Sequence, residues 1–329
     1  MKIDISRNEF YLKHSDKVIK SICSFSENEL SFYPKEELTE SLKKELSHLS
    51  KVNKKHIHLF NGAEDALRKL LLFYRLSYSQ IILEDFSWHL YLKISKSLNY
   101  SIHSARIKKY HESFKTDYDN IEVSLKKSPK SLVLLASPNN PTGHRQDFTR
   151  LKKIISKNKR AIFLIDLVYE SLDSKIFKNL SSHENVICIG SLSKDLGLPG
   201  LRVGFAIGDV HESLRDYLGI SSVSIKIAQT ALEDYKIYKE KNKELSHKFL
   251  NMLETDTFKE GNFKIYASNS HFFLLETSKK ISDIKKSLEK LGLKARIMTH
   301  RRINYVRFSL GNSEIIKRIK SFFKEFSSL

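Results

Sequence analysis

Cysteine is scarce in this sequence, and Cys23 and Cys188 are the only two among its 329 residues. Two cysteines exclude a disulfide framework and a cysteine-rich zinc site, and they favour a reducing, cytoplasmic environment. The histidines are scattered, and none form a metal-binding pair at helical spacing. His56 and His58 alternate as on a strand or loop, and we expect both at the surface. We therefore expect no metal site.

Long apolar runs are missing as well. No run approaches the ~20 residues that a membrane-spanning helix needs. Residues 1–16 are mixed and charged, unlike the apolar segment of a signal peptide. The sequence also lacks a linker rich in glycine, proline or serine, and it shows no repeat of fixed period. We therefore expect a globular protein without a membrane partner.

Acidic residues are few relative to basic ones. Asp and Glu number 38 and Lys and Arg number 57, which gives a formal charge of +19. This excess fits polyanion binding, a membrane surface or a phosphorylated substrate, and it fits a lysine-rich solvated surface equally well. No aromatic and basic RNA motif or recognition-helix pattern stands out. We therefore expect no nucleic-acid partner, and a cationic nucleic-acid-binding protein is a distant alternative.

Hydrophobic residues make up 40% of the chain, enough for a sizeable core, and the length suggests about two domains. Short apolar runs alternate with amphipathic segments such as 63–74 and 151–155. Runs of this kind are typical of buried strands, so their alternation with helices predicts an α/β fold with a mainly parallel sheet covered on both faces. The predicted strands are 80–84, 131–136, 161–165, 186–190 and 203–207.

The last third of the chain changes character. A long polar helix pattern runs from about 225 to 253, and it is followed by shorter strand and helix patterns. These patterns predict a smaller α+β domain, with a soft boundary near 221–224. The later predicted elements are strands at 263–266, 271–276 and 304–309, a helix near 281–291, and a closing helix from 313.

Four polar motifs follow predicted strands, at the edge where open α/β sheets gather ligands. They are Asn61–Glu64, Ser137–Gly143 (SPNNPTG), Asp166 with Tyr169, and the segment from Ser191 to Gly204. Each has an ordinary explanation: a capped helix, a plain turn, a helix N-cap, and one more lysine in a lysine-rich chain.

The same motifs also suggest chemistry. A helix that starts after Asn61 can hold a phosphate at its N-terminus. A carboxylate at the end of a strand, as at Asp166, is expected to face a cation when it is buried. Lys194 stands among hydroxyls, glycines and Arg202, and an amine beside an anion site in a partly apolar pocket suits Schiff-base chemistry.

In this order the motifs resemble those of the class I and II pyridoxal-phosphate aminotransferases. The similarity is greatest to the branch that contains histidinol-phosphate aminotransferase and threonine-phosphate decarboxylase. The resemblance implies fold type I, with a large domain at 33–222 built on a mainly parallel, seven-stranded type of sheet. It also implies an N-terminal arm at 1–32 that packs on the small domain, and a small α+β domain at 223–329.

The resemblance assigns the cofactor pyridoxal 5′-phosphate and its partners by position. Lys194 would form a Schiff base with the cofactor and later move the substrate proton. Asp166 would pair with the ring nitrogen, and Asn140 and Tyr169 would hold the phenolic oxygen. Trp88 falls where the family stacks an aromatic side chain on the ring, although as the only tryptophan it could equally be a core residue. The residues implied for the phosphate are Gly62, Ala63, Glu64, Ser191, Ser193 and Arg202.

The resemblance also implies substrate contacts. Arg307, in the segment YVRFSLG, would bind the substrate α-carboxylate through its planar guanidinium. Arg296 lies near the sequence position at which the phosphate-substrate branch carries a second arginine. Tyr33 matches a tyrosine that the family donates across a homodimer interface. Asn8-Glu9 is a weak match to an N-terminal motif, since the proline of that motif is absent.

The implied activity moves an amino group between an amino acid, possibly a phosphorylated amine or amino acid, and a 2-oxo acid. The runner-up is decarboxylation of a phosphorylated amino acid on the same cofactor. Other chemistry at the substrate Cα, such as cyclisation or elimination in a specialised pathway, stays open. The two leading reactions differ in which Cα bond lies perpendicular to the cofactor ring, and the sequence does not determine that orientation.

Overall fold

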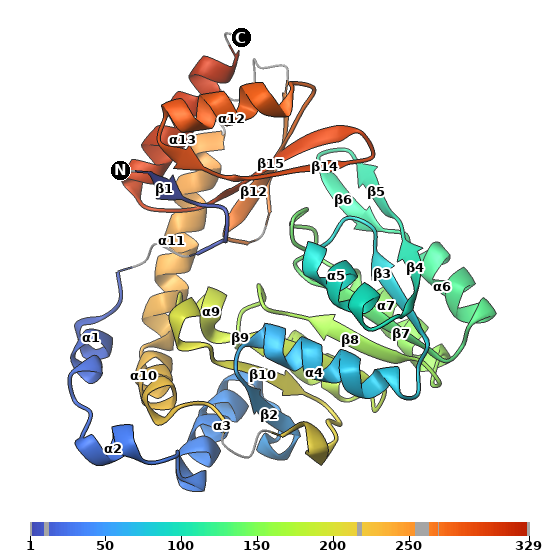
Figure 1. Ribbon diagram of the computed structural model, residues 1–329, viewed down its shortest axis with the longest axis vertical. Coiled ribbons are helices and arrows are strands. Elements are labelled where there is room, and N and C mark those ends of the chain that lie inside the picture. Colours follow the sequence, from blue (N-terminus) through green and yellow to red (C-terminus); the bar gives the residue numbers. More distant parts are fainter. Residues whose placement is uncertain (1, 10–12, 216–218, 254–262, 269, 328–329) are drawn as a thin grey trace.

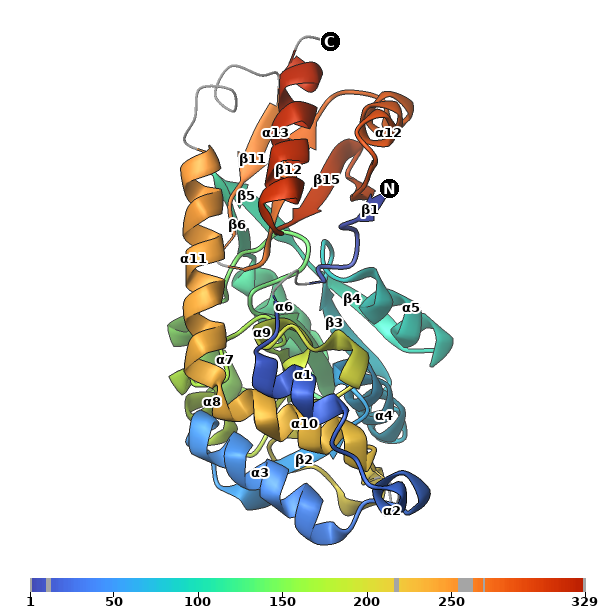
Figure 2. The same ribbon diagram turned by 90° about the vertical axis from the view of Figure 1, so that its left-hand side faces the viewer.

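The computed structural model describes residues 2–9, 13–215, 219–253, 263–268 and 270–327. Figure 1 shows a large sheet in the lower part and a smaller sheet in the upper part, where the N-terminus and the C-terminus also lie. The helix α11 (Tyr235–Leu253) runs along one side from the first part to the second (Figure 2). No helix in the described ranges is both long and apolar enough to cross a membrane.

The large sheet has seven strands, and it is parallel except for one strand. Its order is β2-β10-β9-β8-β7-β3-β4, and β10 is antiparallel to both of its neighbours. The mainly parallel sheet is therefore confirmed, and the five predicted apolar runs all form strands in it. The strands are β2 (Ile57–Phe60), β3 (Gln80–Glu84), β4 (Ser101–Ala105), β7 (Ser131–Ala136), β8 (Ile162–Asp166), β9 (Val186–Ser191) and β10 (Gly204–Ile207).

The strands β2 and β4 were not predicted because polar residues interrupt their apolar pattern. His58 lies in β2 and is buried, so its predicted surface position is wrong; His56, just before the strand, is exposed. Burial lowers the pKa of His58 to about 4, because a charged imidazole loses its hydration there.

Helices cover both faces of the large sheet, as the alternating pattern predicts. One face packs against α4 (Ala63–Arg75) and α5 (His89–Ser97). On α4 the buried residues recur at helical spacing, so one stripe of the helix faces the sheet. The other face packs against α3 (Glu36–Ser50), α6 (Tyr118–Lys127), α7 (Phe148–Lys157), α8 (Lys175–Ser181) and α10 (Ser222–Glu233).

The smaller sheet is antiparallel and has the order β11-β12-β15-β14. Phenylalanines from its strands pack with those of the closing helix in a separate core that includes Phe273, Phe308, Phe322 and Phe323. The N-terminal β1 (Ile3–Asp4) pairs in parallel with β13 (Leu293–Lys294) beside it. The elements are β11 (Phe263–Tyr266), β12 (Phe272–Thr277), α12 (Ile281–Lys290), β14 (Arg296–His300), β15 (Ile303–Ser309) and α13 (Ser313–Ser327).

The limits of the domains stay a proposal, and the packing suggests how to draw them. Residues of α10, together with Tyr235 and Tyr238, belong to the core of the large sheet. Val18 of α1 (Asp16–Ile22) lies in that core too, whereas Ile5 lies in the core of the small sheet. We propose that the N-terminal arm spans both parts and that the large domain extends to about Tyr238.

An aromatic cluster joins the two parts next to the site. The hairpin of β5 (Ile107–Tyr110) and β6 (Ser113–Thr116) reaches from the large part to the small sheet. There the ring of Phe114 lies 4.4 Å from that of Tyr266, measured between centroids. Aromatic side chains bury a large apolar area, so this cluster holds the small sheet over the edge of the large one.

Candidate active site

A cavity of about 850 Å³ lies at the carboxyl edge of the large sheet and is bounded by the small sheet as well. Of the predicted site residues, all but Gly62 and Tyr33 line it. They are Ala63, Glu64, Trp88, Asn140, Asp166, Tyr169, Ser191, Ser193, Lys194, Arg202, Arg296 and Arg307. No group of three metal-binding side chains occurs in the part of the chain that the structure describes.

Strand register explains why motifs far apart in the sequence meet here. Gly204, the first residue of β10, pairs with Phe60 on one side and with Ser191 on the other. The chain leaves β2 after Phe60 to start α4, and it leaves β9 after Ser191 to reach Lys194. Both motifs therefore begin at the same point of the same edge.

Lys194 stands in the short helix α9 (Leu192–Asp195). Its Nζ donates hydrogen bonds to the backbone carbonyls of Arg7 at 3.1 Å and Asn8 at 2.7 Å. Burial, followed by the positive charges of Arg307 and Arg202, lowers the pKa of Lys194 to about 8. At pH 7 roughly a tenth of the amine is thus neutral, far more than for an ordinary lysine, and the neutral form is the nucleophile.

Asp166 ends β8 and is buried. Its carboxylate accepts hydrogen bonds from the hydroxyl of Tyr91 at 2.5 Å and from the backbone N–H of Val168 at 2.9 Å. Burial raises the pKa of Asp166, and these two hydrogen bonds oppose the rise. Among the described residues no basic side chain forms an ion pair with it, so its surroundings suit a cationic group of a ligand.

A second feature is a cradle with anion-binding character at the start of α4. Gly62 precedes this helix with φ 90° and ψ 163°, a conformation essentially restricted to glycine. A Cβ atom on Gly62 would lie 2.5 Å from Nη2 of Arg202, and one on Gly204 would lie 2.4 Å from the backbone nitrogen of Ala63. The two glycines therefore let the arginine, β10 and the helix N-terminus approach one another. The first N–H groups of a helix lack partners within it, so together with a guanidinium they suit a phosphate.

The serines complete the cradle. The Ser191 hydroxyl caps α9 by accepting from the backbone N–H of Ser193 at 3.1 Å, and it donates to the Ser193 hydroxyl at 2.8 Å. The side chain of Glu64 pairs with Arg68 instead, so Glu64 offers its backbone N–H rather than its carboxylate.

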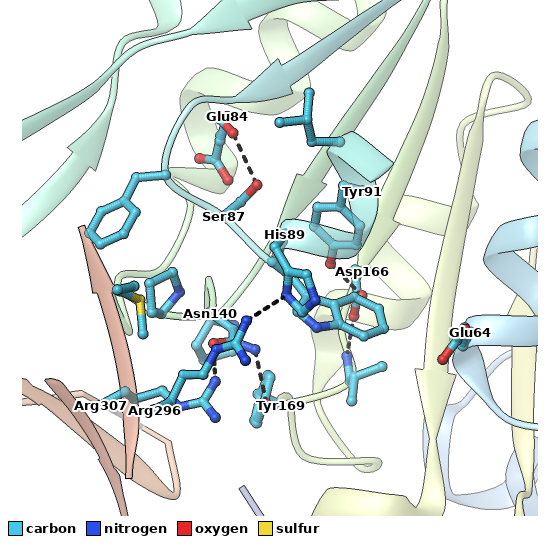
Figure 3. Close-up of a pocket in the computed structure, with 18 of the residues that line it drawn as sticks. Glu64, Glu84, Ser87, His89, Tyr91, Asn140, Asp166, Tyr169, Arg296 and Arg307 are labelled. Atoms are coloured by element: carbon cyan, nitrogen blue, oxygen red, sulfur yellow. Dashed lines mark hydrogen bonds between the residues drawn. The ribbon is translucent and has the colours of Figure 1, made fainter. Parts of the chain in front are cut away.

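On the opposite side, Arg307 of β15 is buried and reaches over to Asn140 (Figure 3). Its Nη1 donates to Oδ1 of Asn140 and its Nη2 donates to the carbonyl of Ser6. The amide nitrogen of Asn140 points to the hydroxyl of Tyr169 at 3.4 Å. The Nε of Arg307 is buried and has no hydrogen-bond partner among the described residues.

Arg296 and Trp88 lie toward the cavity mouth. Arg296 is paired with Arg307 across β14 and β15, so the two project from the same face of the sheet. Its Nη2 is 3.4 Å from Nδ1 of His89, as Figure 3 shows. Trp88 is half-buried: it lines the cavity, contacts the core beneath it and packs edge-on against Tyr91.

Tyr33 does not reach the cavity of its own chain. It follows α2 (Glu27–Ser31) and is 71% exposed. The predicted contact across a dimer interface therefore stays a prediction for this residue.

The loop after β7 that carries the Asn-Asn pair rests on a buried polar network. The carboxylate of Glu84 accepts hydrogen bonds from Asn139 at 2.7 Å, Gln146 at 2.8 Å and Thr116 at 2.5 Å. Burial alone would raise the pKa of Glu84, but its contact with His144 and the hydrogen bonds from Thr116 and Gln146 lower it. The ionised Glu84 thus holds the loop after β7 in place through its hydrogen bonds with Asn139 and Gln146.

Two residues of the site were missed or underrated from the sequence. Tyr91, the partner of Asp166, stands three positions after Trp88. Residues three positions apart share one face of a helix, so this spacing could have placed Tyr91 at the site. Asn8 is buried, and its Nδ2 donates to the hydroxyl of Tyr169 at 2.8 Å. Its only signal was the weak match at Asn8-Glu9.

The donor set fits pyridoxal 5′-phosphate. Asp166 is a buried carboxylate without a cationic partner among the described residues, which suits a protonated ring nitrogen. The cradle at Gly62 and Arg202 suits the phosphate, and the amine of Lys194 opens into the same cavity.

Comparison with known proteins gives a consistent result. The model of the family "Aminotransferase class I and II" matches residues 1–309. A histidinol-phosphate aminotransferase from Clostridium beijerinckii is 27% identical, over 95% of this chain and 87% of that protein. The solved structure of the histidinol-phosphate aminotransferase from Clostridium acetobutylicum has a TM-score of 0.84 and 19% identity, over 99% of both chains.

A further structural relative is the L-threonine-O-3-phosphate decarboxylase from Porphyromonas gingivalis. Its TM-score is 0.76 at 18% identity, over 99% of this chain and 100% of that chain. At this level of identity the two solved structures establish the shared fold and nothing finer.

Proposed function

The chain belongs to the class I and II aminotransferases, pyridoxal-phosphate enzymes of fold type I, and from this premise we propose which residues carry out its amino transfer. The observation that carries the proposal is the amine of Lys194, with a pKa of about 8, in one cavity with Asp166 and the Arg202 cradle. The bound cofactor supplies an electron sink that stabilises negative charge at the substrate Cα.

Asp166 holds the cofactor ring by its nitrogen and keeps that nitrogen protonated. A protonated partner would offset the burial that raises the pKa of Asp166, because an opposite charge favours the carboxylate. Tyr91 fixes the carboxylate from the side by its hydrogen bond. Asn140 and Tyr169 hold the phenolic oxygen, and Ser191, Ser193 and Arg202 hold the phosphate with the start of α4.

Lys194 acts as the base that moves the substrate proton. Its lowered pKa keeps a neutral amine available near neutral pH, which is the condition for an efficient general base. The carbonyls of Arg7 and Asn8 that accept from its Nζ hold the amine at the cavity wall.

Two arginines suggest the substrate class. Arg307 lines the cavity, and its guanidinium suits the α-carboxylate or an equivalent anion. Arg296 is exposed beside it on the same sheet face, and two guanidinium groups suit a doubly charged phosphate, or a phosphate together with a carboxylate. We propose a phosphorylated amine or amino acid as the amino donor and a 2-oxo acid as the acceptor, in line with the histidinol-phosphate aminotransferases among the relatives.

A half-reaction screen tests this function. The cofactor-loaded enzyme is mixed with histidinol phosphate, with O-phosphothreonine and with unphosphorylated amino acids, and the visible absorbance of the cofactor is followed. We expect histidinol phosphate to bleach the absorbance and to leave pyridoxamine phosphate and an oxo product. Arg296→Ala should weaken the response to phosphorylated donors and leave the response to alanine unaffected. Release of CO₂ from O-phosphothreonine would establish the decarboxylase alternative instead.

The enzyme works as a homodimer in this proposal. The segment with α1 and α2 exposes five large apolar side chains: Ile19, Ile22, Leu30, Phe32 and Tyr33. A surface of this kind favours association with a second copy, which would bring Tyr33 to the neighbouring site. A cytoplasmic location is proposed on the two free cysteines. Light scattering on the purified protein tests the dimer, and a fully active monomer would contradict it.

A further inference from the structure

The backbone carbonyl of Asn8 contacts Lys194, and the side chain of Asn8 contacts Tyr169, a proposed cofactor contact. Asn8 lies between the two sheets, on the short segment that follows β1, and only 1% of its surface is exposed. Its backbone adopts φ 53°, a left-handed conformation that asparagine tolerates better than most residues. The buried Asn8 is held by hydrogen bonds to Ser309 on one side and to Tyr169 on the other.

The amide of Asn8 lies between Ser309 and Tyr169. The Ser309 hydroxyl lies 2.7 Å from Oδ1 of Asn8 and 2.6 Å from the carbonyl oxygen of Ile5, and it accepts from the backbone N–H of Asn8 at 3.1 Å. With the oxygen of the amide turned to Ser309, the nitrogen points to Tyr169 and donates to its hydroxyl at 2.8 Å. Asn8 thus contacts Tyr169 only as a donor.

The second partner of Tyr169 is a donor too. Arg307 occupies Oδ1 of Asn140, so the amide nitrogen of Asn140 faces the Tyr169 hydroxyl at 3.4 Å. A hydroxyl has two lone pairs and one proton. The amide nitrogens of Asn8 and Asn140 occupy the two lone pairs of the Tyr169 hydroxyl. Neither amide nitrogen can accept the proton of that hydroxyl.

We propose that Asn8 is a positioning residue that turns the hydroxyl of Tyr169 into a dedicated donor toward the cavity. This inference rests on the proposed function, in which that hydroxyl meets the phenolic oxygen of the cofactor. A donor at this oxygen withdraws negative charge and thereby favours the deprotonated form of the bound cofactor. Loss of Asn8 frees Tyr169 to donate elsewhere and weakens that effect.

The test is the midpoint of the pH titration of the visible absorbance of the bound cofactor. Asn8→Gly removes the side chain and keeps the backbone conformation accessible. Asn8→Asp keeps the shape and the tolerance for a positive φ, and it offers an acceptor to Tyr169. We expect both variants to raise the midpoint, Asn8→Asp by roughly one unit, a tenfold change in the protonation equilibrium. Lys194 and Arg307 also contact this region, and neither is altered.

Two controls separate positioning from folding. Asn99 has nearly the same φ, 55°, is exposed, and lies outside the cavity, so Asn99→Gly should leave the midpoint unchanged. In the Tyr169→Phe background, Asn8→Gly should cause no further shift, because the hydroxyl on which it acts is gone.

The outcomes are distinct. The inference is overturned if the Asn8 variants titrate with the same midpoint as the wild-type protein. It is also overturned if Asn8→Gly shifts the midpoint equally in the Tyr169→Phe background. Either result leaves the proposed function standing. A wild-type protein without visible cofactor absorbance overturns the proposed function and the inference with it.

Discussion

Replacing Gly62 by alanine tests the geometry of the phosphate cradle. The added Cβ would lie 2.5 Å from Nη2 and 2.9 Å from Cζ of Arg202, and it would stand on a backbone with φ 90° and ψ 163°. An ordinary contact needs about 3.4 Å or more, so the guanidinium must move by roughly 1 Å. The backbone strain should lower the free energy of unfolding by ~1–3 kcal/mol.

The displaced guanidinium should also weaken cofactor binding. A hydrogen bond to a charged group contributes ~1.5–3 kcal/mol, so the Kd for pyridoxal phosphate should rise about 10- to 100-fold. Equilibrium dialysis measures the Kd, and chemical denaturation measures the stability. Gly200→Ala is the matched control, because nothing lies within 4 Å of its added Cβ. Unchanged cofactor affinity in Gly62→Ala, or an equal loss in Gly200→Ala, would refute the reasoning.

Three further predictions concern the other groups of the site. Asp166→Asn removes the carboxylate from the ring nitrogen and should lower kcat by ~10²-fold or more in steady-state assays, whereas near wild-type turnover would argue against its role. Arg307→Lys keeps the charge and loses the planar fork, so kcat/KM for the donor should fall about 10- to 100-fold; an unchanged value would remove Arg307 from the carboxylate site. The rate of cofactor capture in stopped-flow mixing should rise with pH and level off above about 8, because deprotonation makes the Lys194 amine nucleophilic, and a pH-independent rate would contradict the lowered pKa.

Much of the fold could be predicted because its central strands are continuous apolar runs. The segment 131–136 is buried along its whole length in β7, and the sequence pattern identified it without any tertiary information. The edge strand β4 and the hairpin of β5 and β6 are short, and polar residues interrupt their apolar positions, so they lack the continuous apolar runs of the central strands. Their pairing depends on contacts with the rest of the protein, which a local pattern does not contain.

The residues of the site also fall into those that the sequence predicts and those that only the structure reveals. Asp166 and Lys194 follow apolar strands, so their common position at one sheet edge could be predicted. The contact between Asn8 and Tyr169 joins residues 161 positions apart, through an N-terminal segment that lies on neither large-sheet face. The pairing of β1 with β13 and the contacts of Asn8 with Ser309 bring Asn8 there, and no local sequence pattern predicts either.

Lys194 is the residue that takes up the cofactor in the proposed reaction. Borohydride reduction of the cofactor-loaded protein, followed by peptide mass mapping, tests this most directly. We predict a stable pyridoxyl modification on the peptide that contains Lys194, and none on that protein when Lys194 is replaced by alanine. Modification of a different lysine in the wild-type protein, or a Lys194→Ala variant that still carries the label, would contradict the central claim.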